Sequence, residues 1–185
     1  MDKFEDAVIF ATQLHKGQKR KINGIPFIMH PIEVATIISS ITTDTDVMIA
    51  GVLHDSIEDG GADPEEIERR FGPKVRELVM SETEKEYANL SKASSWQIRK
   101  QESLYYLKTS SDINVKILWL SDKLANIRSL YVGYLKMGDD VFTFFNQKDK
   151  SKHKWYYETI LSYVSELKGT AAYMEYESLV KKVFE

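Results

Sequence analysis

Residues 45–61 read TDVMIAGVLHDSIEDGG, an apolar run that leads into four ionisable side chains and ends at two glycines. The spacing predicts a helix from about Asp46 to Glu58, with Asp44 or Thr45 as its N-cap. Its apolar residues cover nearly every face, which is typical of a buried helix. The two glycines are expected to end it. This segment therefore predicts a helix at the centre of the protein.

The four ionisable residues of this run are His54, Asp55, Glu58 and Asp59. On a helix, positions i and i+4 lie on one face, so we expect His54 beside Glu58 and Asp55 beside Asp59. Ionisable groups next to an apolar helix are costly unless they are paired or metal-bound. The pattern indicates a metal-binding His–Asp pair with two carboxylates one turn away. A helix end with ordinary solvated acids fits the same residues, and the short motif leaves both interpretations open.

A second candidate is Asp122 in WLSDKLANIRSL, residues 119–130, with Asn126 one turn later on the same face. A carboxylate inside an apolar helix needs a counter-charge or a metal ion. A surface carboxylate paired with Lys123 or Arg128 is the alternative.

A third candidate is His30, which immediately precedes Pro31 at the start of another predicted helix. Capping or packing would also explain it. The chain has no cysteine, which excludes disulfides, thiolate metal sites and cysteine nucleophiles. Two imidazoles and two carboxylates remain as a sulfur-free set that suits Mn, Fe, Mg or Zn, ions that activate water and polarise phosphoryl oxygens. The set is His30, His54, Asp55 and Asp122.

The whole 185-residue chain has only 4 Pro and 9 Gly, which is typical of long helices. Residues 17–29 are expected to form a loop with a short extended stretch, and residues 83–95 a mobile polar loop. No alternation typical of strands is present. We expect one all-α domain, a bundle of about eight to ten helices. Besides the central helix, the expected helices cover 3–16, 31–41, 64–71, 73–79, 94–108, 114–130, 139–146, 151–168 and 170–184.

The charge balance is 25 Lys+Arg against 28 Asp+Glu, a net charge of −3. This excludes the broad basic face of a nucleic-acid-binding protein. No stretch approaches the about 20 apolar residues of a membrane span, and the N-terminus does not read as a signal peptide. We therefore expect a cytoplasmic protein without a membrane association. Arg20 and Lys21 form a local basic pair that suits a small phosphate-rich ligand, although a solvated basic loop is the alternative.

Four separated segments carry a family resemblance when taken in order. They are HKGQKRKINGIPFIMHPIEVA (15–35), AGVLHDSIED (50–59), FGPKVRELV (71–79) and LSDKLANIRSL (120–130). Together they resemble the HD-domain metal-dependent phosphohydrolases, and more narrowly the hydrolase domain of RelA/SpoT proteins and the small alarmone hydrolases. The resemblance covers roughly residues 1–131, and we expect the helices of 139–185 to pack on this core within a single domain.

The resemblance implies a reaction and a set of roles. The substrate would be guanosine tetraphosphate or pentaphosphate, which loses its 3′-pyrophosphate to give GDP or GTP. His30, His54, Asp55 and Asp122 would bind a divalent metal, usually Mn²⁺. Glu58 and Asp59 would activate water. The residues that contact the nucleotide or offset its charge would be Arg20, Lys21, Lys123 and Asn126.

Two alternatives remain open at this point. An HD phosphohydrolase could act on another nucleotide or phosphate ester, because segment 80–95 departs from the family pattern. A non-catalytic nucleotide-sensing or antitoxin module is disfavoured, because all six metal and acid positions are filled. The length leaves no room for a synthetase half. His15 and His153 are expected to be structural, although His15 lies in the loop signature of the family and could approach the site. The C-terminal aromatic residues are expected to fill the core, with a base-stacking wall near Tyr134 as the alternative. The sequence does not indicate an oligomeric state.

Overall fold

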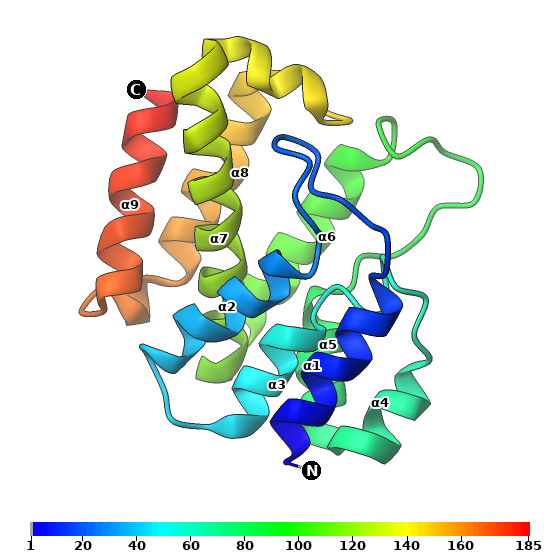
Figure 1. The fold of residues 1–185 in the computed structure, drawn as a ribbon. Helices are drawn as coiled ribbons and strands as arrows, with labels where there is room; N and C mark the ends of the chain where they lie inside the picture. The colour runs from blue at the N-terminus through cyan, green and yellow to red at the C-terminus, as the bar shows by residue number, and fades with distance from the viewer. Residues whose placement is uncertain (1) are drawn as a thin grey trace.

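The computed structural model describes residues 2–185, which form nine α-helices and two short 3-10 helices (Figure 1). The expectation of an all-α fold is confirmed. The only β-type contact among these residues is an isolated bridge between Lys19 and Pro26, in the predicted loop. The helices are α1 Lys3–Leu14, α2 Met29–Ser39, α3 Thr45–Leu53, α4 Pro64–Phe71, α5 Pro73–Glu82, α6 Trp96–Thr109, α7 Ile113–Met137, η1 Gly138–Phe144, α8 Lys150–Tyr163, η2 Ser165–Leu167 and α9 Ala171–Phe184.

The buried helix predicted from the opening segment is α3. Five of its apolar side chains are inaccessible to solvent and Met48 is partly buried; the five are Val47, Ile49, Ala50, Val52 and Leu53. Asp44 caps it by accepting a hydrogen bond from the backbone N–H of Asp46 at 3.0 Å. Helices α1, α2, α5 and α7 all contact α3. A Cβ at Gly51 would lie 2.4 Å from Cδ1 of Ile38, so the missing side chain lets α2 approach closely.

The predicted C-terminal limit of this helix was wrong, because α3 ends at Leu53 rather than near Glu58. The His54 ring nitrogen Nδ1 donates to the carbonyl oxygen of Gly51 at 2.8 Å. In a continuing α-helix that oxygen would accept from the backbone of Asp55. The backbone tightens instead, and the N–H of Ser56 donates to the carbonyl of Leu53 at 2.8 Å. Residues 54–60 are therefore a series of turns rather than one helix face.

Helix α7 is a long central helix, and it extends seven residues beyond the predicted end at Leu130. It lies between α2 on one side and α9 on the other (Figure 1). Its middle turns are buried, including Leu118, Leu120 and Leu124. Asp122 is therefore carried on a buried part of a rigid element.

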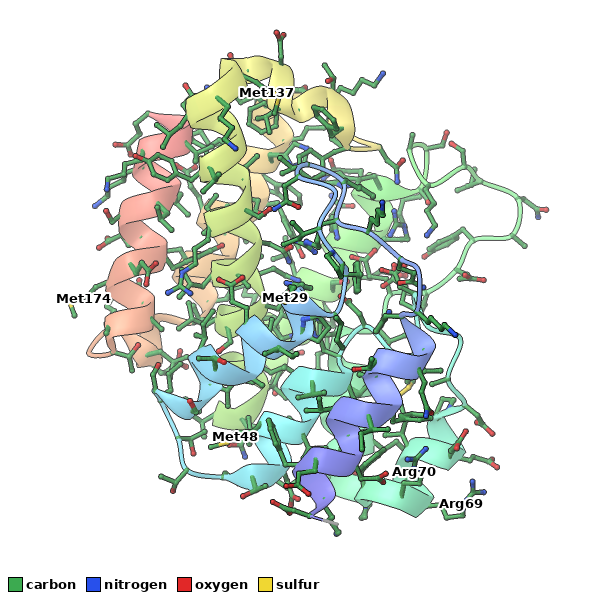
Figure 2. All side chains as sticks on the ribbon, viewed as in Figure 1. Met29, Met48, Arg69, Arg70, Met137 and Met174 are labelled. Atoms are coloured by element: carbon green, nitrogen blue, oxygen red, sulfur yellow. The ribbon has the colours of Figure 1, made fainter. Side chains whose placement is uncertain are left out.

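The C-terminal third packs on α7 through α9 and η1. Tyr176, Tyr157 and Phe142 are buried, as expected for aromatic residues that fill a core, whereas Met174 points outward from α9 (Figure 2). Two predicted helices differ in detail. Residues 138–144 form a 3-10 helix, and 151–168 divide into α8 and η2. Among the described helices, none is both long and apolar enough to cross a membrane.

Candidate active site

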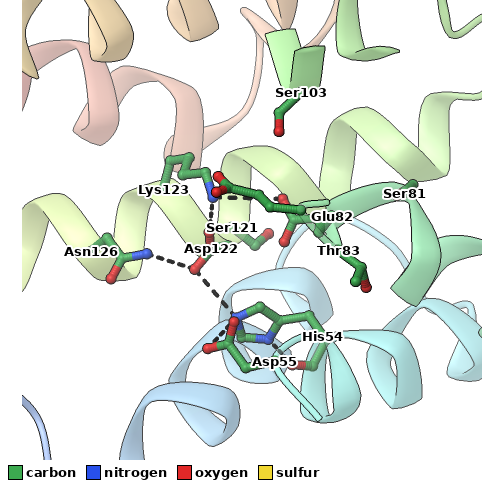
Figure 3. Close-up of polar contacts among 12 residues, drawn as sticks. His54, Asp55, Ser81, Glu82, Thr83, Ser103, Ser121, Asp122, Lys123 and Asn126 are labelled. Carbon is green, nitrogen blue, oxygen red and sulfur yellow. Dashed lines mark hydrogen bonds and ion pairs between the residues drawn. The ribbon is translucent and has the colours of Figure 1, made fainter. Parts of the chain in front are cut away.

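Three separate elements bring four donor side chains together. His30 lies in the first turn of α2, His54 and Asp55 directly follow α3, and Asp122 lies in the middle of α7. His30 Nε2 lies 3.0 Å from Asp122 Oδ1 and 3.2 Å from His54 Nε2. His54 Nε2 lies 3.1 Å from Asp55 Oδ2 and 3.4 Å from Asp122 Oδ1 (Figure 3). Donor atoms of His30, His54 and Asp122 all lie within 4.8 Å of one another, a group able to hold a metal ion.

The hydrogen bonding of this cluster fits a cation at its centre. The Gly51 carbonyl can only accept, so His54 carries a proton on Nδ1 and can turn the lone pair of Nε2 toward His30. Bonding of the outer ring nitrogen to a carbonyl is the usual support for a metal-binding histidine. The donor set, two imidazoles and two carboxylates, suits a hard or borderline divalent ion.

The charges of the cluster also favour a cation at its centre. Burial lowers the pKa of His30, but at His54 the carboxylates of Asp55 and Asp122 outweigh burial and raise the pKa. Burial alone would raise the pKa of Asp122, yet Lys123 and the two imidazoles hold it well below its usual range. The carboxylates thus stabilise positive charge between the imidazoles, which is what a metal ion would supply.

A chain of polar contacts runs from Asp122 to the basic loop. Asn126 donates from Nδ2 to Asp122 Oδ1 at 2.7 Å, and its own Oδ1 accepts from Arg20 at 2.8 Å. Lys123 pairs with the other oxygen of Asp122 (Figure 3). Sequence reasoning grouped Arg20 with Asn126 as nucleotide contacts, but nothing in the sequence indicated that they bond to each other across 106 positions.

All ten predicted site residues line one cavity of about 320 Å³. Its basic loop contributes Arg20 and Lys21, and the turn after α3 contributes Glu58 and Asp59. Burial raises the pKa of Glu58, as do the nearby charges of Glu84 and Asp55. Burial and the charge of Asp55 likewise raise the pKa of Asp59. The positive charges of Lys92 and Lys21 lower it by a smaller amount. Two carboxyl groups with raised pKa beside a metal-type cluster are well suited to exchange protons with water.

The far wall of the cavity consists of residues that sequence reasoning missed. Glu84, near the start of the polar loop of residues 83–95, accepts hydrogen bonds from Arg99 and Lys100 of α6. The tyrosines of α8 complete this wall, and the hydroxyl of Tyr156 is buried without a hydrogen-bond partner among the described residues. The one available signal was the departure of segment 80–95 from the family pattern. The missed lining residues include Glu82, Glu84, Lys92, Trp96, Arg99, Lys100, Tyr156 and Tyr157.

The two remaining histidines are buried. His153 donates from Nε2 to the carbonyl of Gln147 at 2.7 Å and packs against Trp96, Phe142 and Phe145. His15 lies against the ring of Phe27 with centroids 4.7 Å apart. Tyr134, the suggested base-stacking residue, does not line the cavity and instead contacts Lys150.

Comparisons with known proteins agree on one kind of domain. A family model described as HD domain matches residues 7–148. The chain is 37% identical over 131 residues to a guanosine-3′,5′-bis(diphosphate) 3′-pyrophosphohydrolase of Aquifex aeolicus, covering 71% of this chain and 18% of that protein. It is 36% identical over 126 residues to a GTP pyrophosphokinase rsh of Brucella melitensis, covering 68% of this chain and 16% of that protein. The chain thus spans less than a fifth of these two curated relatives.

Two solved structures are similar over nearly their whole length. One belongs to a metazoan ortholog of SpoT that hydrolyses ppGpp and plays a role in starvation responses; it has a TM-score of 0.79 and 27% identity, covering 98% of this chain and 96% of that one. The other is a protein of Listeria monocytogenes EGD-e with a TM-score of 0.71 and 31% identity, covering 84% of this chain and 98% of that one.

Proposed function

The chain belongs to the HD-domain family, and we propose that it is a divalent-metal-dependent hydrolase of guanosine tetraphosphate or pentaphosphate. The reaction would consume one water, release the 3′-pyrophosphate and leave a 3′-hydroxyl on GDP or GTP. The observation that carries this proposal is the convergence of His30, His54, Asp55 and Asp122 in a cavity that also holds an acid pair and several cations. The likeness to proteins with this activity supports the choice of substrate.

His30, His54, Asp55 and Asp122 would hold the metal ion, for which we propose Mn²⁺. When bound, such an ion polarises phosphoryl oxygens and acidifies water. The backbone carbonyl of Gly51 keeps His54 in the tautomer that binding requires. Asn126 and Lys123 hold the two oxygens of Asp122 in place.

Glu58 and Asp59 would orient the attacking water and take up its proton. Their raised pKa values make them stronger bases than solvated carboxylates, because burial disfavours their charged forms. Neither side chain accepts a hydrogen bond from another described residue, so both are free to contact water. Arg20 and Lys21 would offset the phosphate charge, with Arg20 held against Asn126 at 2.8 Å.

The direct test is incubation of the purified protein with guanosine tetraphosphate and Mn²⁺, with and without a chelator. We expect release of pyrophosphate and GDP with Mn²⁺, its loss with chelator, and its return when Mn²⁺ is added in excess. Turnover of another phosphate ester but not of guanosine tetraphosphate would assign the same site to a different substrate. Binding of the nucleotide by metal-loaded protein without turnover would support a non-catalytic module.

A further inference from the structure

Two residues outside the expected site connect helix α1 to the turn that carries the acid pair. His15 follows the last residue of α1 and is buried. Its Nδ1 lies 2.9 Å from the side-chain oxygen of Gln18. The amide nitrogen of Gln18 donates to the backbone carbonyl of Asp59 at 2.8 Å, across 41 positions of sequence.

The direction of these bonds follows from the groups involved. A backbone carbonyl accepts only, so the Gln18 amide must present its nitrogen to Asp59 and its oxygen to His15. That oxygen also accepts only, so His15 donates from Nδ1. His15 Nε2 has no polar partner among the described residues. The polar role of the buried ring is therefore to fix the orientation of the Gln18 amide.

The turn that carries Asp59 is packed closely against α1. A Cβ at Gly60 would lie 2.6 Å from the backbone oxygen of Ser56 and 3.2 Å from Cβ of Leu14. The backbone N–H of Asp59 donates to the carbonyl of Asp55 at 2.9 Å. The peptide groups on both sides of the Asp59 side chain are thus held, one by Asp55 and the other by Gln18.

This backbone support matters because the side chains themselves lack it. The carboxylates of Glu58 and Asp59 accept no hydrogen bond within residues 2–185, so their direction depends on the backbone that carries them. An error of about 1 Å in the position of a reacting group can cost about 100-fold in rate. The orientation of both carboxylates therefore depends on the hydrogen bonds that fix the backbone around Asp59.

We propose that His15 and Gln18 are positioning residues, which aim Glu58 and Asp59 at the attacking water through the backbone of Asp59. This inference rests on the hydrolase function proposed above. Neither residue touches the reacting atoms in this scheme. A purely structural role is the competing explanation, because His15 also stacks on Phe27, and packing alone needs only a flat ring at this position.

The substitutions separate hydrogen bonding from packing. His15→Phe keeps the ring and removes the donor, whereas His15→Asn removes the ring and places an amide N–H where Nδ1 lies. Gln18→Ala removes the link to Asp59. Gln13→Ala, in the exposed part of the last turn of α1, is the matched control.

With guanosine tetraphosphate and Mn²⁺, we expect His15→Phe and Gln18→Ala to lower kcat by about 10- to 100-fold, with KM and bound Mn²⁺ within about 2-fold of wild type. His15→Asn should recover most of kcat, and Gln13→Ala should match wild type. The double variant His15→Phe/Gln18→Ala should lose no more than the worse single variant, because both break one chain of contacts. Wild-type kcat in His15→Phe, or additive losses in the double variant, would overturn the proposal.

Backbone hydrogen exchange supplies a readout that does not depend on turnover. In His15→Phe and Gln18→Ala, amides of residues 54–61 should exchange at least about 10-fold faster, while those of α3 and α7 stay unchanged. Unchanged exchange in residues 54–61 would overturn the positioning role even in an active enzyme. Faster exchange in a protein whose wild type does not hydrolyse guanosine tetraphosphate would instead locate the failure in the proposed function.

Discussion

At the residue scale, the decisive contact is between two imidazole nitrogens that face each other at 3.2 Å. His30 and His54 are both buried, and the nearest charges are the carboxylates of Asp55 and Asp122. Two buried imidazoles at this distance need a proton or a metal ion between them. The carboxylates favour positive charge there, so removing any one donor should weaken metal binding.

Asp122→Asn keeps the shape of the side chain but removes its charge. We expect it to lower Mn²⁺ affinity at least about 10-fold and to abolish pyrophosphate release, because Asp122 contacts both imidazoles and Lys123. His54→Ala should behave likewise. Bound Mn²⁺ measured by elemental analysis, together with turnover, checks both changes. Full turnover by metal-free Asp122→Asn protein would contradict the proposed metal site.

Glu82 places a buried carboxylate without hydrogen bonds in the wall of the cavity. Both oxygens of its buried carboxylate lack a hydrogen-bond partner among the described residues, and Lys123 Nζ lies 3.8 Å away (Figure 3). Burial raises the pKa of Glu82 from 4.5 to about 7, with Lys123 opposing and Asp122 and Asp55 adding to the effect. At neutral and alkaline pH, the ionised form of this carboxylate therefore lowers the free energy of unfolding.

The sign of the pH effect follows from this raised pKa. Below about pH 4.5 both the folded and the unfolded chain bind the proton. Between about pH 4.5 and 7 only the folded chain keeps it, so the free energy of unfolding falls as pH rises, by about 3 kcal/mol in total at about 1.4 kcal/mol per unit. Glu82→Gln should remove this loss. Denaturant unfolding with chelator present should show the variant up to about 3 kcal/mol more stable at about pH 8 and equal at about pH 4. Equal stability at both pH values would contradict a raised pKa.

At the scale of elements, several polar contacts hold the loop of residues 83–95 to α6, and Arg99 makes three of them. Arg99 donates to Glu84 where the loop begins, and to the carbonyl of Lys92 at 3.1 Å and Oγ of Ser95 at 3.2 Å where it ends. Glu84 also pairs with Lys100. Because Lys92 lines the cavity, the order of this loop affects the cavity wall.

Arg99→Ala should release the loop, since a single planar guanidinium makes all three contacts. We expect amide exchange in residues 85–94 to rise at least about 10-fold and the free energy of unfolding to fall by about 1–3 kcal/mol. KM for guanosine tetraphosphate should rise more than kcat falls. Arg69→Ala is the control, because Arg69 projects into solvent from α4 (Figure 2). Unchanged exchange in the loop of Arg99→Ala would show that other contacts hold it.

At the scale of the whole molecule, the four side chains of the proposed metal site come from parts of the chain that are distant in sequence. Its four donors come from α2, the turn after α3, and α7, which surround the centre of the fold (Figure 1). An ion bound there would connect all three elements in the folded state only. Metal binding should therefore stabilise the entire fold and not just the site.

Mn²⁺ should raise the Tm of the wild-type protein, and a chelator should reverse the rise. At a free concentration about 100 times Kd, the expected stabilisation is about 2.7 kcal/mol. Asp122→Asn should show little or no rise over the same range. Calorimetry across a Mn²⁺ series measures the effect, and a wild-type Tm that does not change with Mn²⁺ would contradict folded-state binding.

Much of the fold was predictable because helix signals are local. Asp44, Asp63, Asp112 and Thr170 each bond a backbone N–H at the start of a helix, as capping residues do. The end of α3 was not predictable from periodicity, because a side chain competes with the backbone for one carbonyl. The end of α7, by contrast, has a local signal: Gly138 follows Met137 with a φ of 58°, a conformation that favours glycine and ends helices.

The sequence by itself determined the all-α fold, the ordered motifs, and the ten residues that line one cavity. This was possible because helix periodicity and the motifs of the family are local patterns of neighbouring residues. Only the tertiary structure decided how those residues contact one another. The Arg20–Asn126 bond, the Arg99 network and the link from His15 through Gln18 to Asp59 join segments up to 106 positions apart. Such contacts depend on the packing of whole helices, which no local pattern specifies.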